Sequence, residues 1–289
     1  MRETEIVARI RKLAEAGYQG RAIVKGVGDD CAILRPTANE DLVFTSDMLL
    51  EGRHFTRRTH SPADIGHKAL ARCLSDLAAM GAEPVFCLVS LAIPAGLAGP
   101  WVTRFYRGLL AIATKYQTTL AGGDLARFEK IIADVICCGC VPRGRALLRS
   151  AAKPGDKIYV TGKLGKSWRR NLRPEPRIEA GSTLRGLGVR AAIDLSDGLS
   201  LDLQRLCLES QVSAEIDADL PIARGSTLEQ ALHAGEDYEL LFTAAPKLSL
   251  PARAGTLPIT YIGIIAPGHY GRVLFNGRPL TPKGFDHFA

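Results

Sequence analysis

The chain lacks any long apolar run. No stretch approaches the roughly 18 uninterrupted apolar residues that a membrane-spanning helix requires, so the sequence predicts no membrane association. Residues 1–5 lead into an amphipathic pattern with charges throughout, which differs from a secretory signal. Hydrophobic residues make up 46% of the chain and charged residues 23%, as in ordinary globular proteins. We therefore expect a cytoplasmic globular protein, and 289 residues leave room for two domains.

Clusters of positive charge are also missing. The formal net charge is +7, but the basic residues are dispersed along the chain. Doublets such as Arg57-Arg58 and Arg169-Arg170 do not form a polybasic stripe, and no nucleic-acid-binding motif is present. The sequence therefore predicts no nucleic-acid partner, and it predicts a basic surface that attracts anionic metabolites.

A complete cysteine motif is absent. The seven cysteines are odd in number, and Cys137 and Cys140 form a C-x-x-C that no second Cys or His pair accompanies. Both lie in the apolar run 131–141, which is typical of a buried strand. Because a zinc site needs a full set of ligands, we interpret these cysteines as buried thiols.

A P-loop is absent as well. Residues 162–167 (GKLGKS) follow an apolar strand-like run and contain Gly-Lys-Ser. The P-loop pattern G-x-x-x-x-G-K-[ST] would place its first glycine at position 160, which is Val160. The spacing therefore excludes this kind of phosphate-binding loop.

Short acidic segments are present instead, along almost the whole chain. They are Gly28-Asp29-Asp30, Thr45-Ser46-Asp47, Leu74-Ser75-Asp76, Gly122-Gly123-Asp124, Asp194-Leu195-Ser196-Asp197 and Gly235-Glu236-Asp237. Carboxylates that converge repel one another unless cations lie between them. Oxygen ligands of this kind suit Mg²⁺, which binds carboxylates together with waters and phosphate oxygens. The pattern predicts metal-assisted phosphate chemistry.

Taken singly, each of these residues has a simpler interpretation. An Asp beside Gly or Ser is usually a turn former or a helix cap. The joint pattern favours a metal site, because Asp47, Asp124 and Asp194 all follow strand-like apolar runs. His54 and Arg149, considered alone, are equally consistent with solvent-exposed loop or surface side chains.

Helices and strands alternate irregularly, which favours an α+β fold. Apolar spacing and capping residues predict helices over residues 4–16, 62–80, 100–116 and 226–234, and a further helix after Gly198. Strands are expected at 42–46, 85–93, 131–141, 157–161, 238–243, 259–265 and 272–275, and a turn at 121–124. A change in composition after residue 142 places the domain boundary near 145, giving domains 1–145 and 146–289.

The motifs together resemble one enzyme family. The segments concerned are residues 26–32, 45–55, 68–82, 121–124, 142–150, 193–199, 235–240 and 284–288. In this order they closely resemble thiamine-monophosphate kinase over nearly the full chain. The resemblance implies ATP-dependent phosphorylation of thiamine monophosphate to thiamine diphosphate, the last step of thiamine diphosphate biosynthesis. It also implies the two-domain aminoimidazole-ribonucleotide synthetase-like fold, with N-terminal domains that pair as a dimeric β-barrel and a C-terminal α/β sandwich.

The resemblance also implies roles for individual residues. Several Mg²⁺ ions would be bound by Asp30, Thr45, Ser46, Asp47, Asp76, Asp124, Asp194 and Asp197. The ATP co-substrate would be contacted by Tyr106, Gly123, Arg149 and Ser196, and thiamine monophosphate by His54, Glu236 and Phe285. No residue is expected to act as a covalent nucleophile, because in-line phosphoryl transfer needs positioning and charge neutralisation above all.

Two alternatives remain at this stage. Between Gly165 and Arg173 the chain is shorter than is usual in the family, which prompts the hypothesis of a nucleotide-binding regulatory paralogue without turnover. An aminoimidazole-ribonucleotide synthetase-like enzyme is the nearest enzymatic alternative, and His54 and the C-terminal residues 284–288 favour thiamine phosphate over it.

Overall fold

The structure is a computed structural model that describes residues 3–18, 23–25, 33–34, 37–166 and 172–285. The chain forms two compact units. The N-terminal unit comprises Met1–Leu77, Glu83–Arg143 and Leu172–Pro174, and the C-terminal unit comprises Ala78–Ala82, Gly144–Asn171 and Glu175–Ala289. None of the helices in the described ranges combines the length and the apolar character that a membrane span requires.

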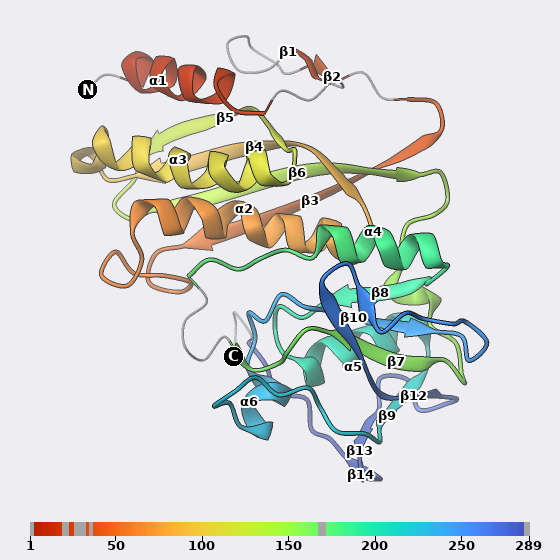
Figure 1. Cartoon of the computed structure of the whole chain (residues 1–289). Coiled ribbons are helices and arrows are strands. Elements are labelled where there is room, and N and C mark those ends of the chain that lie inside the picture. Colours follow the sequence, from red (N-terminus) through yellow and green to blue (C-terminus); the bar gives the residue numbers. More distant parts are fainter. Residues whose placement is uncertain (1–2, 19–22, 26–32, 35–36, 167–171, 286–289) are drawn as a thin grey trace. The chain divides into compact units, whose positions relative to one another are not determined.

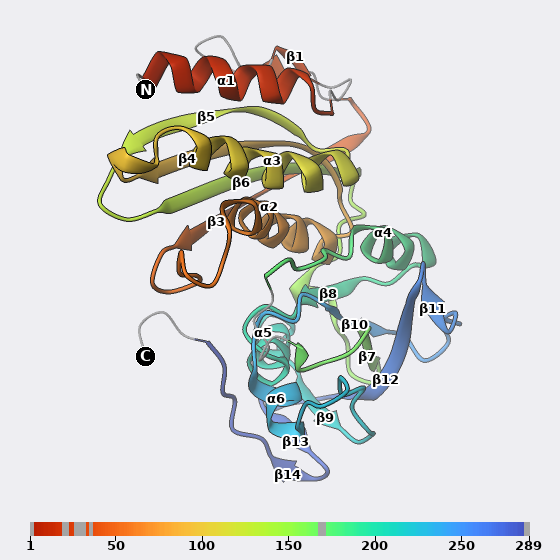
Figure 2. The ribbon, with the colours of Figure 1, turned by 60° about the vertical axis from the view of Figure 1, so that its left-hand side comes forward.

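The N-terminal unit is a four-stranded sheet with two helices on one of its faces (Figure 1). Its elements are α1 (Glu3–Glu15), β1 (Ile23–Lys25), β2 (Ile33–Leu34), β3 (Glu40–Leu50), α2 (Pro62–Ala79), β4 (Glu83–Ile93), the 3₁₀ helix η1 (Ala95–Leu97), α3 (Pro100–Lys115), β5 (Thr119–Arg127) and β6 (Ile132–Pro142). The strand order is β3-β6-β4-β5, with β4 and β5 parallel and the other pairs antiparallel. Helix α1 packs against α3 and β5 (Figure 2).

Helices α2 and α3 approach each other closely where both carry a glycine. A Cβ at Gly66 would lie 2.0 Å from the carbonyl oxygen of Phe105, and a Cβ at Gly108 would lie 2.0 Å from that of Ala63. Only glycine permits this backbone contact, because any side chain would overlap the facing helix. The predicted helices over 62–80 and 100–116 are therefore confirmed, and their glycines determine how closely they pack.

The expected turn at residues 121–124 is wrong, because β5 continues through this segment to Arg127. The glycines that suggested a turn serve a close strand contact instead. A Cβ at Gly123 would lie 2.0 Å from the carbonyl oxygen of Val89 on β4, and the φ of Gly123 is +151°. Glycine is therefore required here by packing and backbone conformation.

This contact predicts a large difference between neighbouring glycines. Gly123→Ala is expected to lower the free energy of unfolding by roughly 3 kcal/mol, since the new methyl group overlaps backbone. Gly122→Ala is the matched control, because its Cβ would meet only the end of the Leu88 side chain at 3.3 Å. Urea denaturation of both variants measures the difference, and equal losses would contradict the packing argument.

The C-terminal unit is built on a second, larger sheet. Its elements are η2 (Arg149–Ala151), β7 (Lys157–Thr161), α4 (Ile178–Leu187), β8 (Ala191–Asp194), α5 (Leu199–Ser210), β9 (Ser213–Ile216), α6 (Leu228–His233), β10 (Leu240–Ala244), β11 (Arg253–Ala254), β12 (Leu257–Ala266), β13 (Val273–Phe275) and β14 (Arg278–Pro279). The order is β14-β13-β9-β12-β7-β10-β8, with β11 paired to β12. Pairing is antiparallel except between β13 and β9.

Alternation along these strands produces two cores, one on each face of the sheet. Ile158 and Leu241 pack with residues of α5 and α6. Phe242, the neighbour of Leu241, packs on the opposite face with α4 and the last turn of α2. Successive strand residues point to opposite faces, so a strand that is apolar throughout is covered by helices on both sides.

The cysteines of the described residues are free thiols, and most are buried. Burial raises the pKa of Cys138 to about 11 and that of Cys207 to about 12, so both remain protonated at neutral pH. Cys137 and Cys140 lie three positions apart on β6, and residues at that spacing on a strand face opposite sides of the sheet. This C-x-x-C therefore does not present both sulfurs to one ion. Cys31 lies outside the described residues.

Candidate functional site

One face of helix α2 lies along strand β3 and presents a polar row to it. Lys68, Arg72 and Asp76 are spaced four residues apart, so they share one side of the helix. The Lys68 ammonium donates to the His54 carbonyl oxygen at 3.4 Å, and Arg72 and Asp76 contact Asp47 and Thr45. Sequence reasoning missed Lys68 and Arg72, although their spacing from Asp76 was a usable signal.

The contacts of this row join predicted metal ligands. The Thr45 hydroxyl donates to Oδ2 of Asp76 at 2.5 Å. Both carboxylate oxygens of Asp47 accept from the Arg72 guanidinium, at 3.0 Å from Nε and 2.6 Å from Nη2. The Asp47 side chain is 22% exposed and that of Arg72 is 15% exposed. The structure thus brings Thr45, Asp47 and Asp76 together, with a cation already beside Asp47.

Ser46 and Asp124 lie on the other face of the same sheet. Ser46 is between Thr45 and Asp47 on β3, so its side chain points away from α2. Its hydroxyl donates to Oδ1 of Asp134 at 3.0 Å. The strand register places Asp134 beside Ser90 and Ser90 beside Asp124. Asp134 was not predicted, although an Asp within an otherwise apolar strand was a signal for it.

The remaining predicted residues of the N-terminal unit lie in different environments. Nδ1 of His54, in the turn after β3, accepts from the backbone N–H of Leu50 at 2.9 Å. Tyr106 is buried within α3, and burial raises its pKa well above the ordinary value. Gly123 lies within β5, one residue before Asp124. Asp30 lies outside the described residues.

In the C-terminal unit, three segments distant in sequence meet at the start of α5. The backbone N–H of Glu236 donates to the Ser196 carbonyl oxygen at 2.7 Å, and that of Phe285 donates to the Asp197 carbonyl oxygen at 3.2 Å. Glu236 has a φ of +64°, a conformation that is uncommon for residues other than glycine. The structure therefore brings Ser196, Asp197, Glu236 and Phe285 together.

A buried carboxylate organises this turn. Oδ2 of Asp202, which is fully buried, accepts from the backbone N–H groups of Asp197 and Gly198, both at 3.0 Å. Burial raises the pKa of Asp202 to about 6. Arg205 donates to Oδ1 of Asp202 at 3.0 Å and also pairs with Asp197. Sequence reasoning missed both Asp202 and Arg205.

Neither Asp194 nor Arg149 is part of the turn at the start of α5. Asp194 is buried at the end of β8, where it pairs with Leu240 of β10. The Arg149 carbonyl oxygen accepts from the Ser210 hydroxyl at 2.6 Å, at the C-terminal end of α5. A helix of 12 residues is about 18 Å long, so Arg149 and Ser196 lie near opposite ends of α5. The structure does not bring these two predicted nucleotide contacts together.

A second network, of hydrogen bonds to Asp237 and Glu239, holds the segment that follows Glu236. Asp237 accepts from the backbone N–H groups of Gly165 and Lys166 at 2.7 and 2.9 Å. Glu239 is fully buried and accepts two hydrogen bonds from Arg177, at 2.9 Å from Nε and 2.7 Å from Nη2. The Glu239 carboxylate also accepts from Thr161 at 2.9 Å and from Lys166 at 3.3 Å. These bonds fasten the segment around Gly165 to the segment that carries Glu236.

The candidate metal ligands of both units are oxygen atoms, which suit a hard cation. Thr45, Asp47 and Asp76 offer oxygen atoms only, as do Asp194 and Asp197. Within the described ranges, no group of three or more His, Cys, Asp or Glu side chains converges on one point. The residues therefore match Mg²⁺ in ligand type, and water or phosphate oxygens would complete its coordination.

Comparison with known proteins identifies the family to which the chain belongs. Residues 28–141 match the family model of the AIR synthase related protein, N-terminal domain. The chain is 40% identical to the thiamine-monophosphate kinase of Salmonella typhimurium in an alignment of 303 residues, which covers 91% of this chain and 92% of that protein.

Solved structures are similar over the same extent. The crystal structure of thiamine-monophosphate kinase from Stenotrophomonas maltophilia is 38% identical, with a TM-score of 0.83 and coverage of 97% of this chain and 98% of that one. A structure of AaThiL complexed with AMPPCP and TMP is 30% identical, with a TM-score of 0.80 and coverage of 100% and 99%. The chain therefore belongs to the thiamine-monophosphate kinase family.

Proposed function

We propose that the chain transfers the γ-phosphoryl group of ATP to thiamine monophosphate and forms thiamine diphosphate and ADP. The observation that carries this proposal is the likeness to thiamine-monophosphate kinases over nearly the full chain, at 40% and 38% identity to two of them. The carboxylates found in both units fit it, because a donor and an acceptor that are both polyanions need cations between them. Since ATP is the donor, we place the reaction in the cytoplasm.

The proposed ligands of Mg²⁺ are oxygen donors of both halves of the chain. They are Asp30, Thr45, Ser46, Asp47, Asp76, Asp124, Asp194 and Asp197. Bound Mg²⁺ would neutralise charge on the phosphate oxygens. In this proposal residues 1–145 form the metal- and ATP-binding and dimerisation domain, and residues 146–289 complete the site.

The remaining residues would bind and orient the two substrates. Tyr106, Gly123, Arg149 and Ser196 would contact ATP, and His54, Glu236 and Phe285 would contact thiamine monophosphate. The exposed Arg149 guanidinium suits a phosphate group, and the ring of Phe285, which is 38% exposed, suits a cationic thiazolium ring. The transfer is direct, without a phosphoenzyme; trapping a covalently phosphorylated protein would contradict this step.

We also propose that the chain is a homodimer, joined through the face of the N-terminal sheet that α2 and α3 leave open. On this face the β3 side chains of Phe44 and Met48 are 61% and 49% exposed. Phe44 packs edge-on against Phe86 of β4, with ring centroids 6.5 Å apart. A second copy could extend this four-stranded sheet into a β-barrel and would bury these side chains.

Charge on this face is expected to separate the dimer. In the double variant Phe44→Glu, Met48→Glu, two carboxylates would be buried at the interface, so the protein should sediment as a monomer. Tyr270→Glu is the control, because Tyr270 is 62% exposed in the C-terminal unit. Analytical ultracentrifugation measures the mass; a wild-type monomer, or a double variant that stays dimeric, would refute the proposed interface.

The proposed activity is tested with a panel of acceptors. The purified chain is mixed with ATP, Mg²⁺ and either thiamine monophosphate, thiamine or no acceptor, and thiamine diphosphate and ADP are measured by chromatography. We expect thiamine diphosphate with thiamine monophosphate, in equal amount to ADP. Metal-dependent nucleotide binding without product for any acceptor would instead support a regulatory paralogue.

A further inference from the structure

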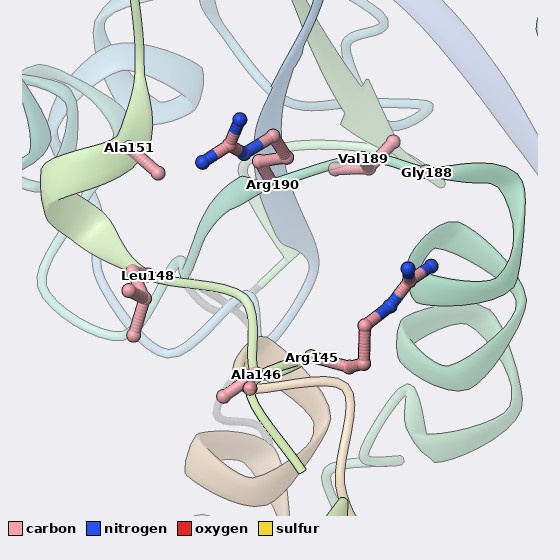
Figure 3. A pocket seen from close by; sticks show the side chains of 8 residues that line it. Arg145, Ala146, Leu148, Ala151, Gly188, Val189 and Arg190 are labelled. Carbon is pink, nitrogen blue, oxygen red and sulfur yellow. The ribbon is translucent and has the colours of Figure 1, made fainter. Parts of the chain in front are cut away.

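The C-terminal unit contains a pocket that the proposed reaction does not use. It has a volume of about 310 Å³. It lies between residues 144–151, which include η2, and residues 188–190, which join α4 to β8 (Figure 3). Its lining residues are Gly144, Arg145, Ala146, Leu148, Ala151, Gly188, Val189 and Arg190. This volume is at the lower end of the range of small-molecule sites.

The walls of the pocket are held in place by backbone hydrogen bonds. The backbone N–H of Leu148 donates to the Arg190 carbonyl oxygen at 2.8 Å, which joins the two segments. The backbone N–H of Leu147, whose side chain is fully buried, donates to the Met80 carbonyl oxygen at 3.0 Å. Gly188 caps α4 in the left-handed conformation and so directs the chain toward Arg190. A pocket with fixed walls loses little entropy on binding a ligand.

The charged side chains that line the pocket are both positive. Arg145 and Arg190 line it from different segments, and both are exposed (Figure 3). Among the described residues that line it there is no Asp or Glu. Across the described part of the chain, neither guanidinium has an ion pair or a side-chain hydrogen bond. Two guanidinium groups with available donors favour a phosphate group.

The rest of the lining is apolar. Leu148 is 46% exposed although it is a large hydrophobic side chain, and the half-buried Ala146 and Ala151 add further apolar surface. A phosphate ion alone would leave this surface in contact with water. A ligand with an apolar or aromatic body would cover it, which is favourable in proportion to the area removed from water.

We propose that this pocket binds an organic phosphate, with the phosphate group on Arg145 and Arg190 and an apolar or aromatic body against Leu148. The proposal does not depend on the proposed function, since Arg145, Leu148 and Arg190 are assigned neither to Mg²⁺ nor to ATP or thiamine monophosphate. The predicted nucleotide contact Arg149 is not one of the described residues that line the pocket.

The test measures binding by isothermal titration calorimetry to the full chain in buffer with EDTA and no added metal. Under these conditions nucleotide binding that requires Mg²⁺ is silent, whereas binding to arginines persists. The probes are ADP, thiamine monophosphate and inorganic phosphate, which separate the possible sources of the phosphate group. The variants are Arg145→Ala, Arg190→Ala and Leu148→Ser, with Arg278→Ala as control because Arg278 is exposed on β14 of the same unit.

We expect ADP or thiamine monophosphate to bind at least about tenfold more tightly than inorganic phosphate. Each arginine variant should weaken that binding about tenfold or more, since a hydrogen bond to a charged group is worth at least one factor of ten. Leu148→Ser should weaken only the organic probes, and Arg278→Ala should change nothing. Thermal melts equal to wild type show that the variants are folded.

Three results would overturn the proposal. They are the absence of binding by both organic probes, equal binding of inorganic phosphate, and organic-phosphate binding that neither Arg145→Ala nor Arg190→Ala weakens. Because these measurements contain no Mg²⁺ and no turnover, their failure leaves the proposed kinase activity untouched, and failure of that activity leaves the pocket untouched.

Discussion

Asp47→Asn is expected to lower the rate of thiamine diphosphate formation by a factor of roughly 10² to 10³, the cost of removing one preorganised electrostatic contact to a transition state. Asp47 lies beside Thr45 and Asp76 in the structure, and its carboxylate is already paired with Arg72. An amide has no charge with which to hold a cation, so the phosphate oxygens would keep more of their repulsion. The measurement is the steady-state rate as a function of Mg²⁺ concentration.

The control for this variant lies on the same strand. Asp41 is six residues before Asp47 on β3, so it shares a face with Asp47, and it is not a proposed ligand. Asp41→Asn should retain the wild-type rate. If Asp47→Asn also retained it, with an unchanged requirement for Mg²⁺, Asp47 would serve only to pair with Arg72. Thermal unfolding of both variants excludes loss of the fold as the cause.

Arg177→Ala is expected to lower the free energy of unfolding by about 3–5 kcal/mol, the cost of leaving a buried charge without its partner. Glu239 is fully buried, and Arg177 supplies two of its hydrogen bonds. Lys166 and Thr161 remain as donors, but the Lys166 side chain is 46% exposed and compensates poorly. Guanidinium chloride denaturation measures the loss.

An exposed arginine provides the comparison for Arg177. Arg173 pairs with Asp64 at 2.6 Å, and its side chain is 60% exposed. Arg173→Ala should therefore cost at most about 1 kcal/mol. A double variant, Arg177→Met with Glu239→Leu, should recover most of the loss, because it removes both buried charges. Similar losses in the two single arginine variants would contradict the assignment of Arg177 and Glu239 as a structural pair.

The helices and long strands were predictable because their apolar periodicity is strong. The helix predicted over 62–80 is observed as Pro62–Ala79, and the strand predicted over 131–141 is observed as Ile132–Pro142. Strand β9 was missed because it is only four residues long and follows α5 after the left-handed residue Gln211. Short strands carry too few alternating residues to be distinguished from loops.

The candidate site was predictable in its acidic residues but not in their partners. Arg72 acquires its role through a contact with Asp47, 25 positions away in sequence, and Glu239 through a contact with Arg177, 62 positions away. Spacing within one element does not reveal such contacts, because they depend on how strands and helices pack. Ser46 illustrates the converse, since its neighbours Thr45 and Asp47 face α2 while Ser46 itself faces the open side of the sheet.

The central claim is that this chain moves the γ-phosphoryl group of ATP onto thiamine monophosphate with the aid of Mg²⁺. The most direct measurement follows γ-³²P-labelled ATP incubated with the purified chain and thiamine monophosphate, in Mg²⁺ and in EDTA. We expect the label in thiamine diphosphate, only with Mg²⁺, and never on the protein. Label that is released as inorganic phosphate or remains in ATP, under conditions where the nucleotide binds, would contradict the claim.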